Sequence, residues 1–195
     1  MKTILKKLSS IAFAALILLS VMPLISAVPP PDNIAMWIEP ATVDPIALGL
    51  GLHDTFQVTV WAKANVDIKG WQFWLDYNSN HLNATACVYS AGSQSDYFLG
   101  LSTFPVAPSF TVVDPDTNRI AFGESGGIGV VAPPNTAALA VLTFEIMAVP
   151  GKGDSLISEI NISDAANSTT DKTYIIDGTD TAIHYYTAYD TTYSY

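Results

Sequence analysis

The sequence predicts an all-β protein, a single β-sandwich domain that follows an N-terminal signal segment. Apolar residues alternate with polar ones at period two in many short runs, which is the pattern of strands with one buried face. Gly, Pro, Asn and Asp separate these runs at intervals typical of a sandwich, and helix signals are nearly absent after the leader. The length of 195 residues leaves room for one such domain once the leader is set aside.

Residues 1–27 have the features of a secretory signal peptide. Three lysines precede an apolar run from Leu8 to Ile25, and Ser26 and Ala27 offer a small-residue cleavage site. The run is near the lower limit for crossing a bilayer, so an uncleaved membrane anchor is the alternative. We expect a secreted, extracellular protein, attached to the cell surface and in contact with a membrane only if the leader is retained.

The rest of the chain divides into a spacer, a domain and a tail. Residues 28–34 contain three consecutive prolines, which predict a stiff, extended spacer. Residues 35–188 carry the strand pattern without an internal repeat, so we expect the sandwich there. Residues 189–195 mix Tyr, Thr and Asp, and we expect a last strand that frays into a flexible tail.

Ten segments have the composition and spacing of strands. They cover residues 35–39, 55–62, 68–77, 82–89, 110–113, 119–123, 138–148, 155–162, 174–176 and 182–189. The run over 136–148 is ambiguous, because its Ala and Leu content also suits a helix. Strand is favoured there, since Leu142, Phe144 and Ile146 alternate with other residues and Pro150 ends the run.

The densest aromatic run, residues 70–77, predicts the central strand and a binding surface. One phase of the alternation is large and apolar: Trp71, Phe73, Leu75 and Tyr77. The other phase carries Gln72, Trp74 and Asp76, and Trp61 has the same outward phase on the strand over 55–62. Aromatic side chains flanked by polar groups bind sugars and proteins on flat sheet faces. We therefore predict that these four residues bind a ligand or partner; the alternative is that another element covers the two tryptophans.

Composition excludes some classes of partner. The chain has 8 Lys and Arg against 18 Asp and Glu, a net charge of −10. Nucleic-acid binding depends on cations that neutralise phosphates, so no nucleic-acid partner is expected. The charge fits solubility outside a cell, neutral glycans, basic partners or divalent cations.

No catalytic residue is predicted. Residues 123–127 match the G-x-S-x-G pattern around Ser125, but the apolar, Pro-containing segment that follows cannot open the helix that a nucleophile elbow needs. The three histidines lie in ordinary turn or strand contexts. A hydrolase using Ser125 is therefore only a third hypothesis, behind recognition and structural roles, and we expect no enzyme.

No cofactor is predicted either. The Asp114–x–Asp116–x–Asn118 spacing resembles the start of a calcium loop but lacks the Gly and Glu that such a loop requires, so we expect a hairpin turn. A structural Ca²⁺ held by four late acids is the alternative to solvated turns. Those acids are Asp164, Asp171, Asp177 and Asp180.

Two further residue types bear on a secreted chain. The single cysteine, Cys87, cannot form an internal disulfide; we expect a buried, inert thiol, with an intermolecular disulfide as the alternative. Three N-glycosylation sequons begin at Asn83, Asn161 and Asn167, and we expect them in exposed loops.

The order of these motifs resembles a cohesin domain. A strand like residues 56–60 leads to the Gly-x-Gln-Phe-x-Leu-x-Tyr strand over 70–77, closed by Asn80-x-Leu82. Strands resembling residues 119–122 and 142–146 follow, then Asp164 and a closing segment over 176–178. The resemblance covers residues 35–188 and implies a nine-stranded jelly-roll sandwich, immunoglobulin-like in outline and related to cellulose-binding modules.

The resemblance also implies a function. In cohesins one sheet face binds the dockerin module of a partner, and outward side chains of the central strand take part; the matching positions are Gln72, Trp74 and Asp76. We expect a non-catalytic recognition module that binds a polysaccharide or a dockerin-like protein. The alternative is a structural subunit of a surface layer or filament, assembled by strand addition.

Overall fold

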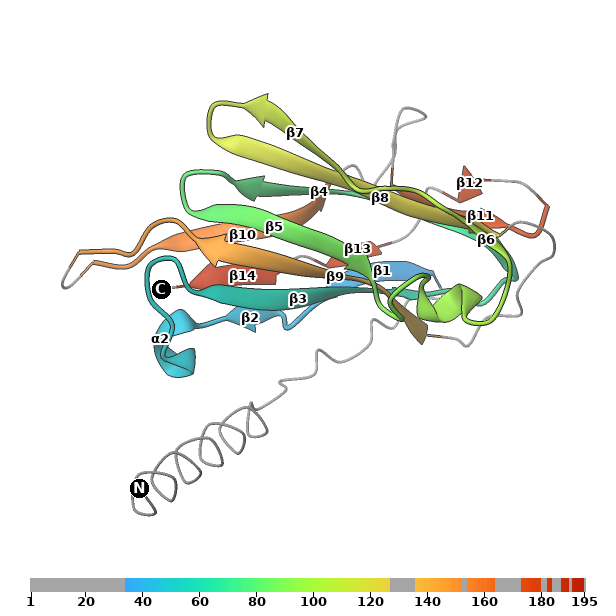
Figure 1. The fold of residues 1–195 in the computed structure, drawn as a ribbon, viewed down its shortest axis with the longest axis horizontal. Coiled ribbons are helices and arrows are strands. Elements are labelled where there is room, and N and C mark those ends of the chain that lie inside the picture. Colours follow the sequence, from blue (N-terminus) through green and yellow to red (C-terminus); the bar gives the residue numbers. More distant parts are fainter. Residues whose placement is uncertain are drawn as a thin grey trace, which may run out of the picture.

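The structure is a computed structural model that describes residues 34–126, 136–151, 154–163, 173–179, 182–183, 187–189 and 191–194. The expected signal peptide and nearly all of the expected spacer lie outside these residues. The described chain forms two β-sheets packed face to face (Figure 1). Nowhere in these ranges is a helix long and apolar enough to cross a membrane.

The first sheet, called here the β3 sheet, has five strands in the order β13–β1–β3–β9–β5. Their bounds are β1 Ala35–Glu39, β3 Thr55–Lys63, β5 Leu82–Tyr89, β9 Thr136–Ile146 and β13 Thr187–Tyr189. All pairs are antiparallel except β1 with β13. The order leaves β5 at one edge of this sheet.

The second sheet, the β4 sheet, is built around β4 (Ile68–Asn78). On one edge β4 pairs with β8 along most of its length, and on the other its two halves pair with β11 and β10. The remaining elements are β2 Thr42–Val43, α2 Pro45–Leu48, η1 Asp96–Phe98, β6 Thr103–Pro105, β7 Ser109–Asp114, β8 Thr117–Gly126, β10 Ile157–Ser163, β11 Tyr174–Asp177, β12 Ala182–Ile183 and β14 Thr191–Ser194. The predicted central strand is confirmed.

The core lies between the two sheets, where the alternating apolar residues meet. The four large inward residues of β4 are each at most 4 % exposed. Opposite them, Phe56 and Phe144 of the β3 sheet stack at 5.7 Å, and the ring of Tyr77 meets Phe144 edge-on at 5.2 Å. Burying side chains of this size contributes about 1.5–3 kcal/mol each. This core fixes the direction of the outward side chains on β4.

Most expected strands are confirmed within a few residues. The ambiguous run is a strand, β9, with Leu142, Phe144 and Ile146 inward. The expectation over 182–189 splits into β12 and β13 in the described residues. Two short strands, β2 and β6, and the single turn of helix α2 were not expected, and β14 lies where a fraying strand and tail were expected.

The expected flexible tail is wrong for its described part. Residues 191–194 form β14, which pairs with β10 and β2 in the β4 sheet. Tyr193 is fully buried and stacks on Phe56 with ring centroids 5.6 Å apart. The Thr191 hydroxyl donates a hydrogen bond to the Pro40 carbonyl. Residues 191–194 therefore help to complete the core.

The prediction that Cys87 is buried is confirmed. The residue is 5 % exposed on the inner side of β5. Burial disfavours the thiolate and raises the pKa of Cys87 to about 12. Since thiolates are the reactive form of cysteine, this thiol is protected in the folded protein.

Candidate functional site

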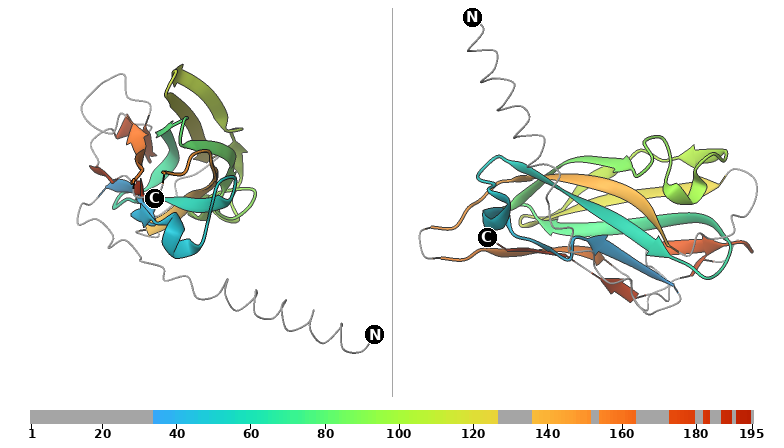
Figure 2. Two further views of the ribbon diagram at one scale, coloured as in Figure 1. Left: turned by 90° about the vertical axis from the view of Figure 1, so that its left-hand side faces the viewer. Right: turned by 90° about the horizontal axis from the view of Figure 1, so that it is seen from below.

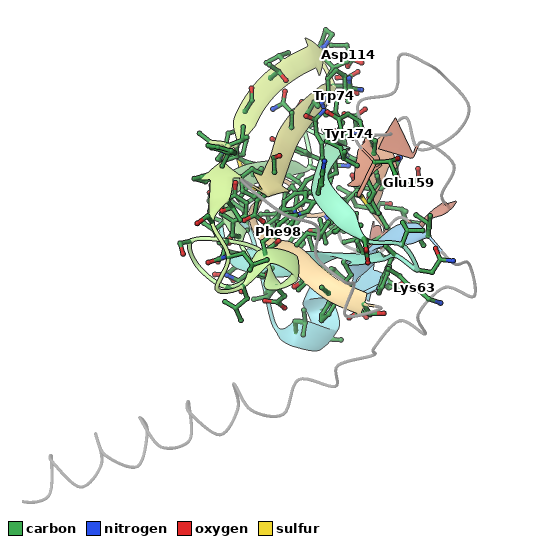
Figure 3. The ribbon with its side chains drawn as sticks, turned by 90° about the vertical axis from the view of Figure 1, so that its right-hand side faces the viewer. Lys63, Trp74, Phe98, Asp114, Glu159 and Tyr174 are labelled. Carbon is green, nitrogen blue, oxygen red and sulfur yellow. The ribbon has the colours of Figure 1, made fainter. Side chains whose placement is uncertain are left out.

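The candidate site is the outer surface of the β4 sheet, called here the β4 face. Seven half-buried side chains from four strands define it: Gln72, Trp74, Asp76, Arg119, Ala121, Asn161 and Tyr174. The strand register places Arg119 and Asn161 on either side of Asp76, Ala121 beside Trp74, and Tyr174 beside Gln72. Figure 3 shows Trp74 and Tyr174 on the same side of the molecule.

An ion pair and a stacked ring form the centre of the β4 face. Arg119 Nε donates to Asp76 Oδ1 at 2.6 Å, and Arg119 Nη2 donates to Asp76 Oδ2 at 2.7 Å. The guanidinium carbon also lies 4.4 Å from the centroid of the Trp74 ring. A bidentate, charge-assisted pair and a cation–π contact both restrict the rotamers involved. The three side chains therefore form one pre-organised cluster, which we call the Arg119 cluster.

The backbone beneath the cluster is also held. The Trp74 N–H donates to the buried Thr173 Oγ1 at 2.8 Å, which anchors β4 to the segment that enters β11. On the other edge, β8 approaches β4 so closely that a Cβ on Gly123 would lie 2.8 Å from the Trp71 carbonyl oxygen. Gly123 is thus required for the strand pairing that brings Arg119 opposite Asp76.

Carboxylates surround one end of the β4 face. Asp114 and Asp116 lie exposed in the turn between β7 and β8, and Glu159 is exposed on β10. Arg119 and Asp76 form an ion pair, and the two side chains together carry no net charge. A partner that covers this end meets a negative surface.

The four residues predicted to bind a ligand do not share one surface. Gln72, Trp74 and Asp76 lie together on the β4 face, whereas Trp61 is on β3 in the other sheet. There it stacks on Trp37 at 6.3 Å and 15°, and Trp37 is 2 % exposed. The prediction that Trp61 points away from the core is correct. However, the alternation of side chains along a strand does not show which of the two sheets the strand joins. Trp61 is therefore excluded from this site.

Sequence reasoning missed Arg119 and Tyr174. Arg119 was recognised only as the start of a strand, although an outward cation and an outward acid on neighbouring strands form a plausible pair. The missing information was the register, because Asp76 and Arg119 are 43 residues apart in the chain. Tyr174 comes beside Gln72 through the β11–β4 pairing in the same way.

Ser125 does not lie in a nucleophile elbow. It belongs to extended strand β8 and pairs with Gly70 near the start of β4. His81 follows the far end of β4, a separation of about 26 Å along the strand. The neighbouring Glu124 points inward, where its Oε2 accepts the Ser95 N–H at 2.9 Å. Residues 123–126 are therefore part of a paired strand and do not have the strand–turn–helix geometry of a nucleophile elbow.

The expected hairpin at Asp114–Asn118 is confirmed. Asp114 Oδ1 accepts the Asp116 N–H at 2.9 Å, as in a turn, and β7 and β8 flank it. Asn80 Nδ2 donates to Asp116 Oδ1 at 2.7 Å, which ties this turn to the one after β4. The late acids proposed for Ca²⁺ lie outside the described residues, apart from Asp177, whose side chain is not described.

The expectation of exposed loops is wrong for the two described sequons, whose asparagines lie on strands in different environments. Asn83 is exposed on β5, the edge strand of the β3 sheet. Asn161 lies mid-sheet beside Asp76, and its Oδ1 is buried. Asn167 lies outside the described residues. Glycosylation stays a prediction, and geometry favours Asn83 over Asn161 as the acceptor.

Comparison with known proteins identifies the fold. No protein-family profile and no curated protein matches the sequence. Among solved structures, a non-cellulosomal cohesin from the archaeon Archaeoglobus fulgidus matches with a TM-score of 0.51 and 11% identity, over 84% of this chain and 91% of that one. The second type II cohesin module of the adaptor ScaA scaffoldin of Acetivibrio cellulolyticus matches with 0.53 and 12%, over 85% and 91%.

A third similar structure comes from a complex. A type I cohesin–dockerin complex from Clostridium thermocellum matches with a TM-score of 0.54 and 16% identity, over 83% of this chain and 98% of that one. The matches extend over nearly the full length of the solved chains. Together with the two-sheet topology, they show that this chain has the fold of a cohesin domain.

Proposed function

We propose that the chain is a non-catalytic protein-recognition module that binds a dockerin-like partner through the β4 face. The observation that carries the proposal is the Arg119 cluster, a rigid group of charged and aromatic side chains at the centre of an outer sheet face. Pre-organised Trp and Arg side chains are the residues most often responsible for binding energy in protein interfaces. A partner that binds these side chains loses little rotamer entropy, because the contacts within the Arg119 cluster already restrict their rotamers.

Structures with this fold support a protein partner. One of them is the type I cohesin–dockerin complex from Clostridium thermocellum. Another is the sixth cohesin of scaffoldin B from Acetivibrio cellulolyticus in complex with a dockerin, with a TM-score of 0.51 and 13% identity. The acidic end of the β4 face adds a charge requirement, so the partner should present Lys or Arg there.

A protein partner is favoured over a polysaccharide by the environment of Trp74. Sugar binding on a flat sheet uses the open face of an aromatic ring. The guanidinium of Arg119 already lies 4.4 Å over the Trp74 ring and occupies one of its two faces. We also propose that the module acts outside the cell, on the basis of the leader in its sequence.

Binding assays with matched variants test the proposal. The purified chain is titrated with a panel of dockerin modules and, separately, with soluble polysaccharides. Trp74→Ala and Arg119→Ala should each weaken dockerin binding at least about tenfold, as expected for a central interface residue. The matched control is Gln57→Ala, an exposed site on the β3 sheet.

Each outcome separates the alternatives. Dockerin binding that survives both substitutions on the β4 face, or is lost in Gln57→Ala, contradicts the proposed surface. Binding to a polysaccharide with quenching of tryptophan fluorescence, and to no dockerin, contradicts the proposed partner. Binding to neither class also contradicts it.

A further inference from the structure

One edge of the β4 sheet exposes an uncharged, apolar surface. No charged side chain occurs between Asp96 and Asp114, in a chain with a net charge of −10. Strands β6 and β7 of this segment carry four of the large apolar residues that are 46–75% exposed, and we call them the β7 edge. They are Phe104, Phe110, Val112 and Val113.

The β7 edge runs along the rim of the sandwich. β6 pairs with the last residues of β8 and β7 with the earlier ones, so the two strands form consecutive parts of one edge. Figure 2 (left) shows β7 and β8 at the rim. Within the described ranges, β8 is the only strand that pairs with β7, so the outer backbone groups of β7 are open for pairing.

Open edges are usually protected, and this one is protected only in part. Natural proteins place charges, prolines or bulges on edge strands to prevent pairing. Here Pro105 and Pro108 interrupt the junction between β6 and β7, and a register shift marks a bulge after Val112. The stretch from Ser109 to Val112 has neither proline nor charge, and it has high β propensity.

Charge and the apolar side chains of β7 indicate a second copy of this chain as the occupant. A basic partner would find no carboxylate to pair with on the β7 edge, whereas two acidic copies would bring no like charges together there. On β7 itself, the exposed apolar side chains Phe110 and Val112 lie on either side of Thr111, so two antiparallel copies would bring apolar side chains against apolar side chains.

We propose that two copies associate through the β7 edge, with β7 antiparallel to β7 about a two-fold axis at Thr111. In this register Thr111 meets its own equivalent, Phe110 lies opposite Val112, and Ser109 lies opposite Val113. The axis lies within the uncharged stretch, and Asp114 stays at the periphery. The β4 sheet then continues from one copy into the other.

The pairing would place two β4 faces side by side on one continuous surface. A dimer of this kind presents two recognition sites in fixed geometry, which raises the apparent affinity for a partner that carries two binding modules. The dimer itself depends only on the β7 edge. Its failure is therefore distinguishable from failure of the proposed function, which depends on the Arg119 cluster.

Sedimentation velocity of the purified chain over a range of concentrations is the first test. Val112 is 75% exposed, so Val112→Lys disturbs no core packing, yet it places a charge in the interface of each copy. We expect its dimer dissociation constant to rise at least about tenfold. Ile157→Lys is the matched control, because Ile157 is 64% exposed on β10, and it should leave the constant unchanged.

A cysteine placed on the two-fold axis tests the register. Thr111→Cys should form an intermolecular disulfide rapidly under mild oxidation, since the two thiols would face each other. The native Cys87 is buried and does not interfere. Gln57→Cys, an exposed site on the other sheet, controls for random collision.

The two experiments can overturn the proposal in separate ways. A chain that stays monomeric at all concentrations, or a dimer that Val112→Lys does not weaken, shows that the β7 edge is not a self-association surface. A dimer that Val112→Lys weakens, with Thr111→Cys cross-linking no faster than Gln57→Cys, contradicts the antiparallel register. Retention of dockerin binding by Val112→Lys would confirm that the two surfaces act independently.

Discussion

Replacing Asp76 with alanine should measure how strongly the Arg119 cluster is held together. The substitution removes two charge-assisted hydrogen bonds of 2.6 and 2.7 Å and leaves a guanidinium that is mostly shielded from water. Hydrogen bonds to charged groups contribute about 1.5–3 kcal/mol in protected sites, and exposed ion pairs about 0–1 kcal/mol. The side chains of Arg119 and Asp76 are 19% and 21% exposed, which places the pair between these limits.

From these values we expect Asp76→Ala to lower the free energy of unfolding by about 2 kcal/mol. In a chain of this length that corresponds to a fall in Tm of about 4–8 °C. Guanidinium chloride unfolding, followed by tryptophan fluorescence and circular dichroism, gives the free energy directly. The control is Asp67→Ala. Asp67 is exposed, and its hydrogen bond in the described structure is made by its backbone carbonyl, which accepts the Gly178 N–H and is kept in the alanine variant. The free energy of unfolding should therefore change by less than about 0.5 kcal/mol.

A double-mutant cycle with Arg119→Ala isolates the pair from the other contacts of Arg119. We expect a coupling energy of about 1–2 kcal/mol between Asp76 and Arg119, reduced by high salt. A coupling energy below about 0.3 kcal/mol, or a loss in Asp76→Ala no larger than in Asp67→Ala, would refute the reasoning. The cluster would then not be pre-organised, and the argument for the β4 face would lose its basis.

Three further predictions concern other parts of the fold. Tyr193→Ala should lower the free energy of unfolding by about 3–5 kcal/mol, because it removes a fully buried ring from the core, as chemical denaturation would show. Cys87 should react with a thiol reagent at pH 8 only at the rate of unfolding, since its pKa is raised to about 12. The pKa of Glu145 is lowered chiefly by its hydrogen bond from His53, so its small contribution to stability is present above the ordinary Glu pKa and is lost as pH falls through the lower folded value. His53→Ala should raise that pKa toward its ordinary value in an NMR titration.

The faces of individual strands could be predicted from the sequence, because side-chain direction in a strand is a local property. The two phases of β4 and the inward residues of β9 follow from alternation alone. The relation between strands could not be predicted in this way. Trp61 has the correct phase but belongs to the other sheet, and Arg119 reaches Asp76 only through the β8–β4 register.

Short and polar strands were predicted less well for a different reason. The four residues of β14 contain one large side chain, Tyr193, so they show no alternation of apolar residues. Their strand conformation depends on pairing with β10 and β2, which are distant in the chain. β6 has only three residues and ends in Pro105, a residue that usually argues against a strand.

The place of β14 in the core bears on when the chain can fold. Thr191 and Pro40, 151 residues apart, meet where β14 joins β2, so the two ends of the domain must come together before the β4 sheet is complete. Contacts of such long range slow folding. During synthesis, which starts at the N-terminus, the β4 sheet therefore cannot be completed until residues 191–194 have been made.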